Sequence, residues 1–77
     1  MNLGEQTPKT PDMADFPALR RLAELLLASV SALAEAGKVE AACRLAGQAY
    51  VTLRGADPAA ARRFDVLLHR LAPTLRW

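Results

Sequence analysis

Residues that would supply covalent or metal-based stabilisation are nearly absent from this sequence. Among its 77 residues there is one cysteine, Cys43, and one histidine, His69. A single cysteine forms no intrachain disulfide, and one cysteine with one histidine cannot provide the four ligands of a structural zinc site. Because a core of this size rarely contributes more than about 3–5 kcal/mol, the fold must depend on close helix packing or on association with another subunit.

Aromatic and β-branched residues are also few, with two phenylalanines, one tyrosine and one tryptophan in the chain. Strands favour these residue types, whereas the abundant leucine and alanine favour helices. The sequence therefore predicts an all-α fold. Its richness in alanine, arginine and leucine is typical of a GC-rich bacterial gene.

Groups that could carry out catalysis are scarce as well. His69 falls on the polar side of its predicted helix, which indicates a solvated histidine. Cys43 falls on an apolar helix face, where a cysteine is usually a small core residue and not a reactive thiolate. The chain contains no Glu-x-x-His pair and no glycine-rich phosphate loop. We therefore expect no enzyme, no metal, no cofactor and no small-molecule substrate.

Long hydrophobic runs are missing too. The longest unbroken apolar run in the first predicted helix is Leu25–Ala28, far too short to span a bilayer. The first residues lack the basic start and the apolar run of a signal peptide. We expect a cytoplasmic protein without a membrane partner.

The chain divides at about residue 15 into an acidic start and a basic remainder. Residues 1–14 contain Gly4, Pro8 and Pro11 without helical periodicity, which predicts a flexible tail followed by one helical domain over residues 15–77. Residues 1–15 have a net charge of −2, and residues 16–77 have a net charge of +4. The positive excess is well below that of a typical nucleic-acid-binding protein.

Capping residues divide the domain into helices. Asp15 is a predicted N-cap, and Gly37 fits the left-handed position after a helix end. Asp57 followed by Pro58 is a strong start signal for another helix, which Pro73 ends. The predicted helices cover residues 16–36, residues 38–54, and the segment from residue 58 to about Pro73. Their two short connections predict a three-helix antiparallel bundle, ordered up-down-up.

At 100° per residue, each predicted helix has an apolar face. In the first helix this face is made of large residues: Leu19, Leu22, Leu26, Val30 and Leu33, flanked by Leu25 and Leu27. In the second, most of the residues are small: Val39, Ala42, Cys43, Ala46, Ala49, Tyr50 and Leu53. In the third they are Ala60, Phe64, Leu67, Leu68 and Leu71. Leu26 lies at the centre of the first face, so we expect Leu26→Asp to collapse the fold.

The hairpin "LAEAGKVEAACRLAGQAY" resembles a tetratricopeptide-type repeat over about residues 26–54. The matching positions are a glycine between the helices, apolar, mostly small residues in the second helix and leucines in the first: Gly37, Val39, Ala42, Ala46, Ala49, Leu26 and Leu33. The resemblance implies a helical hairpin of the kind that binds peptides in arrays. Val30 departs from the very small residue that the family prefers, and no second copy of the repeat follows, so one hairpin would not build the concave peptide groove.

Apolar residues outside the predicted core are either ordinary isolated surface residues or part of a surface that binds another protein. Val51 and Val66 fall outside the apolar faces, and the face of the first helix is wide enough for a second neighbour or a subunit contact. We predict a protein-interaction or regulatory module that associates with itself as a homodimer, or with another protein. The predicted contact residues are Leu25, Leu26, Leu27, Phe64 and Trp77.

Basic residues of the third helix leave a second hypothesis open. Four arginines point away from its apolar face or follow it: Arg62, Arg63, Arg70 and Arg76. In one interpretation they contact phosphates, and the chain is a nucleic-acid-binding accessory protein. In the other they belong to a solvated helix and pair with Glu24, Glu35 or Glu40.

Overall fold

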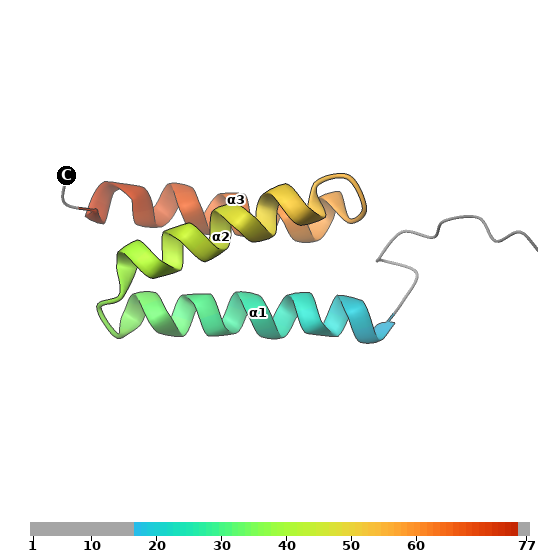
Figure 1. Cartoon of the computed structure of the whole chain (residues 1–77), viewed down its shortest axis with the longest axis horizontal. Coiled ribbons are helices and arrows are strands. Elements are labelled where there is room, and N and C mark those ends of the chain that lie inside the picture. Colours follow the sequence, from blue (N-terminus) through green and yellow to red (C-terminus); the bar gives the residue numbers. More distant parts are fainter. Residues whose placement is uncertain (1–16, 76–77) are drawn as a thin grey trace, which may run out of the picture.

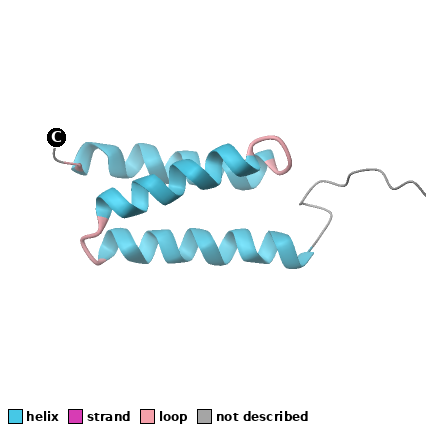
Figure 2. Cartoon of the chain, in the orientation of Figure 1, coloured by secondary structure: helices cyan, strands magenta, loops and turns pink. Residues whose placement is uncertain are grey.

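The computed structural model describes residues 17–75, and these residues form three helices and one short turn (Figures 1 and 2). The helices are α1 (Pro17–Glu35), α2 (Val39–Leu53) and α3 (Pro58–Leu71), followed by the 3-10 turn η3 (Ala72–Thr74). Residues 17–75 contain no strand, so the predicted all-α three-helix bundle is confirmed. The predicted tail (1–14), Asp15, Arg76 and Trp77 lie outside the described residues.

Local capping chemistry fixes where the helices end. Gly37 has φ 88°, and the N–H groups of Gly37 and Lys38 donate to the carbonyls of Ala34 (3.0 Å) and Leu33 (2.9 Å). This pair of bonds is a Schellman motif, which a glycine in the left-handed region closes without steric cost. The end of α1 is therefore encoded by one residue.

Asp57 caps the start of α3 as predicted. Its carboxylate accepts a hydrogen bond of 3.2 Å from the backbone N–H of Ala60, and Pro58 occupies the first helical position. The side chain replaces one of the backbone partners that a helix N-terminus lacks. Figure 1 shows α1 and α2 joined at one end of the molecule, and α2 and α3 joined at the other.

The core is built mainly of alanine. Of the eight buried hydrophobic residues among those described, five are alanines: Ala23, Ala42, Ala46, Ala49 and Ala61. Val30 and Phe64 are the largest side chains that are fully buried, and Leu53 is 4% exposed. Small side chains let the helix axes approach closely, which is the packing expected for the predicted face of α2. On α3 the core contact is made by Phe64 and Ala61, with Ala60, Leu67, Leu68 and Leu71 packed beside them.

The predicted face of α1 is wrong by about 60° of rotation around the helix axis. The residues that face the core are Ala23, Val30 and Ala34, with Leu27 and Leu33 beside them. The leucines that we expected to be buried are partly exposed: Leu19 36%, Leu22 57% and Leu26 40%. At the close approach that the alanine-lined α2 imposes, a small side chain fits between the helices and a leucine does not.

This correction also changes what we expect of Leu26. Its side chain lies at the edge of the α1–α2 contact, 40% exposed, and not at the centre of the core. A carboxylate placed there could reach water, so Leu26→Asp should weaken the fold moderately and not collapse it.

No helix within residues 17–75 combines the length and the apolar character needed to cross a membrane.

Candidate protein-interaction surfaces

One side of α1 presents a row of exposed, uncharged residues. We call this row the α1 seam. Its members are all exposed and are spaced alternately four and three residues apart, with the last directly after the end of the helix: Ala18, Leu22, Leu25, Ser29, Ala32 and Ala36. Leu22 is 57% exposed and Leu25 is 46% exposed. At 100° per residue, Leu25 points about 160° away from Ala23, which faces the core. The seam therefore faces outward along the whole of α1.

The spacing of the α1 seam is that of a coiled-coil heptad. Residues that repeat at alternating intervals of four and three occupy the a and d positions, which contact a partner helix. No charged residue of α1 falls in the sector that runs from Ala32 past Leu25 and Leu22 to Leu19. On the other side of the seam, Arg21 and Glu24 form an exposed ion pair of 3.2 Å.

A second apolar row adjoins the seam where α1 meets α2. Leu26 of α1 and Leu45 of α2 line one shallow groove with Ala49 and Leu53 and with the polar residues Gln48 and Thr52. Leu26 is 40% and Leu45 is 38% exposed. The exposed apolar surface of α1 thus continues onto α2.

The structure separates the five predicted contact residues. Leu25 belongs to the α1 seam, and Leu26 lies at its border with α2. Leu27 is half-buried on a different side of α1. Phe64 is 1% exposed, so it holds the core together and cannot contact a partner in this fold. Trp77 lies outside the described residues.

A groove between α1 and α3 forms the second candidate surface. We call it the α1–α3 groove. It is open because α3 packs mainly against α2 and much less against α1. Residues of both helices line it: Leu27 and Ser31 from α1, and Arg62, Arg63, Val66, Leu67 and Arg70 from α3. Three of the four arginines predicted to bind phosphate therefore lie along one groove, together with Leu27; Arg76 is outside the described residues.

The arginines of the α1–α3 groove have no acidic partner within residues 17–75. The acidic groups that we expected to neutralise them are either committed to neighbours on their own helices or lie apart. Glu24 pairs with Arg21, and Glu40 pairs with Arg44, each at 3.2 Å. Arg62, Arg63 and Arg70 are therefore exposed, as the solvated-helix interpretation expects, but they do not form the ion pairs with glutamates that it also expects.

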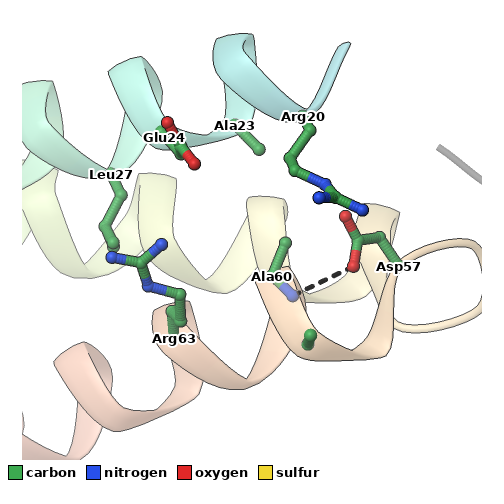
Figure 3. A pocket seen from close by; sticks show the side chains of 8 residues that line it. Arg20, Ala23, Glu24, Leu27, Asp57, Ala60 and Arg63 are labelled. Carbon is green, nitrogen blue, oxygen red and sulfur yellow. Dashed lines mark hydrogen bonds between the residues drawn. The ribbon is translucent and has the colours of Figure 1, made fainter. Parts of the chain in front are cut away.

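At one end the α1–α3 groove reaches the N-terminus of α3. Figure 3 shows Arg63 extending from α3 toward Leu27, and Arg20 of α1 pointing toward the carboxylate of Asp57. Asp57 is 5% exposed. The same carboxylate caps α3 through Ala60, so this end of the groove is a structural joint between α1 and α3.

Removing the Asp57 carboxylate should destabilise the protein. We expect Asp57→Ala to lower the free energy of unfolding by about 1–2 kcal/mol, because the start of α3 loses its cap. Asp57→Asn keeps an oxygen acceptor at the N-cap and should lose less than half as much. Urea unfolding followed by circular dichroism measures both, and equal losses for the two variants would contradict a capping role.

His69 and Cys43, the histidine and cysteine of the described residues, lie on different helices. His69 is 78% exposed, with Nδ1 2.8 Å from the carbonyl oxygen of Asp65 and 3.3 Å from its carboxylate, as expected of a solvated histidine. Cys43 is half-buried on α2, less enclosed than the predicted core position. Among residues 17–75, no three His, Cys, Asp or Glu side chains come together as metal ligands would.

Comparisons of the chain with known protein families, with curated proteins and with solved structures find no match. The resemblance of residues 26–54 to a tetratricopeptide hairpin therefore stays a prediction. Sequence reasoning had missed the α1 seam, although its signal is visible in the sequence as an uncharged heptad that includes Ala18 and Ala36.

Proposed function

We propose that this chain is a small protein-interaction module that forms a homodimer by pairing its α1 seam with the α1 seam of a second copy. The observation that carries the proposal is the exposed, uncharged heptad on the side of α1 that faces away from the core. An uncharged surface offers nothing to an oppositely charged partner, but it complements an identical surface across a two-fold axis.

The small core gives a reason for association. Five of its eight buried hydrophobic residues within 17–75 are alanines, each of which buries little apolar area. Chains of this length gain little stability from their own core, and a partner that binds only the folded state adds to it. Burial of Leu22 and Leu25 in a dimer would add buried apolar area, and therefore stability, that the small core does not provide.

The sizes of the seam residues favour an antiparallel pair. When two seams cross with their midpoint between Leu25 and Ser29, Leu25 faces Ser29 of the second copy. Leu22 then faces Ala32 of the second copy. Each large side chain meets a small one, which is how close-packed helix interfaces avoid both voids and overlap.

The rows that flank the α1 seam favour the same orientation. One flank carries Arg21, Ala28 and Glu35 at heptad spacing. In the antiparallel pair Arg21 lies opposite Glu35 of the second copy, so opposite charges meet at both ends of the interface. The other flank carries Leu19, Leu26 and Leu33, of which Leu33 is half-buried against the core. In this orientation Leu26 lies opposite Leu26 of the second copy.

A single spin label tests the pairing and its direction. We expect Lys38→Cys, labelled in a Cys43→Ser background, to give an interchain separation on the order of 30 Å, because antiparallel helices carry residue 38 to opposite ends at about 1.5 Å per residue. Electron paramagnetic resonance measures the distance. A separation near the interhelix distance of about 10 Å would show a parallel pair instead. The absence of any dipolar coupling at high concentration would contradict the dimer itself.

A further inference from the structure

We propose that the α1–α3 groove binds an acidic amphipathic helix of a partner protein. Its floor is apolar, formed by Leu27 and Leu67, with Val66 48% exposed at the edge. Its charged lining residues are Arg62, Arg63 and Arg70, and the acidic side chains of Glu24 and Asp57 line only the adjoining hollow at the N-terminal end of α3. A surface with an apolar floor and a positively charged rim is complementary to a helix that carries apolar side chains and carboxylates on one face.

The order of residues along α3 defines the pattern that the partner must carry. Arg62 and Arg63 lie one turn before Val66 and Leu67, and Arg70 lies one turn after them. The two charged ends are thus about 11–12 Å apart, or two helical turns. A partner helix fits this arrangement when it carries acidic residues at positions i and i+7 and apolar residues at positions i+3 and i+4.

The unpaired state of these arginines supports a binding role. Within residues 17–75, Arg21 and Arg44 pair with acidic groups of their own helices, whereas Arg62, Arg63 and Arg70 have none. A guanidinium group is suited to bidentate contact with a carboxylate, and such contacts are stronger than those of a neutral donor.

The apolar floor distinguishes a peptide from a nucleic acid. A phosphate backbone would contact the arginines but would gain nothing from Leu27, Val66 and Leu67, because nucleic-acid backbone recognition is polar and electrostatic. The observed combination therefore favours an acidic peptide over the phosphate-binding hypothesis.

This binding does not depend on the proposed dimer. The groove uses Leu27 and Ser31 on α1, which point about 120° or more away from Leu25 in the seam. Both copies of a dimer would keep their grooves open. A seam variant such as Leu22→Asp/Leu25→Asp should bind the acidic helix as the unaltered chain does, so failure of one proposal is separable from failure of the other.

Fluorescence anisotropy with a designed probe tests the inference. The probe is a labelled helical peptide of about 18 residues with glutamates seven positions apart and leucines at the third and fourth positions between them. We expect Arg62→Gln/Arg70→Gln to weaken its binding about tenfold or more. The matched control, Arg44→Gln/Arg54→Gln, also removes two positive charges, but from α2. It should change the affinity less than about twofold. Val66→Asp, at an exposed position, should also weaken binding.

Two further ligands decide what the groove recognises. A probe with the leucines replaced by serines keeps its charge, and we expect it to bind about tenfold more weakly. A double-stranded oligonucleotide at the same ionic strength should bind more weakly than the acidic helix. Equal binding of the leucine and serine probes, tighter binding of the oligonucleotide, or equal losses in the groove and control variants would each overturn the proposal.

Discussion

Leu22→Asp/Leu25→Asp should convert a dimeric protein into a monomer that keeps its helices. Both leucines are exposed in the isolated chain, at 57% and 46%, so the charges meet water when the chain is alone. In the proposed dimer the same charges would be buried against the second copy without partners, which costs several kcal/mol for each group. We expect the dissociation constant to rise by on the order of 1,000-fold or more.

Val51→Asp is the control for a new charge at an exposed apolar position outside the seam. Val51 is as exposed as Leu22, at 58%, but it lies on the outer side of α2 and not on the seam. It receives one new negative charge, where the seam variant receives two, and it should leave dimerisation unchanged. Sedimentation velocity at matched concentrations compares the three proteins, and equal effects of the seam and control variants would show that the seam is not the interface.

Phe64→Ala should nearly abolish the stability of the fold. Phe64 is 1% exposed and is one of the two largest side chains that are fully buried among the described residues. Truncating a buried phenylalanine costs about 3–5 kcal/mol, which is comparable to the whole contribution expected from a core of this size. We expect the cooperative thermal transition, followed by circular dichroism at 222 nm, to disappear or to fall by tens of degrees.

Val51→Ala provides the comparison for the core. It removes apolar atoms from a position that is 58% exposed, and its cost should stay below about 0.5 kcal/mol. A Phe64→Ala protein that melts within a few degrees of the unaltered chain would mean that Phe64 is not central to the packing.

The end of α1 and the start of α3 could be predicted from the sequence because each depends on the chemistry of one or two neighbouring residues. Gly37 is suited to a positive φ, and an aspartate before a proline caps a helix wherever that helix packs. The face of α2 was also predictable, since Ala42, Ala46 and Ala49 recur at helical spacing and all three are buried in the core.

The rotation of α1 could not be predicted in the same way. Hydrophobic periodicity weights a leucine above an alanine, so it placed Leu26 at the centre of the face. In the structure Ala23 faces the core instead of Leu26, because the small side chains of α2 let the two helices approach closely. Once the side of α1 that faces the core is known, Leu22 and Leu25 can be recognised as leucines that the core does not use.

The α1–α3 groove was only half visible in the sequence. The arginines of α3 were recognisable as a basic helix face, but Leu27 was assigned to a surface shared with Leu25 and Leu26. A one-residue step turns a helical side chain by about 100°, which carries Leu27 away from Leu25 and toward α3. Only the packing of α1 beside α3 unites Leu27 with Arg62 and Arg70.

Sedimentation equilibrium of the full chain over a range from about 1 µM to 1 mM tests self-association most directly. The single chain has a mass of 8.3 kDa. We expect the measured mass to rise with concentration and to level off at about twice that value, as a closed two-fold pair requires. A mass of 8.3 kDa at every concentration, or one that climbs without levelling, would contradict the homodimer formed through the α1 seam.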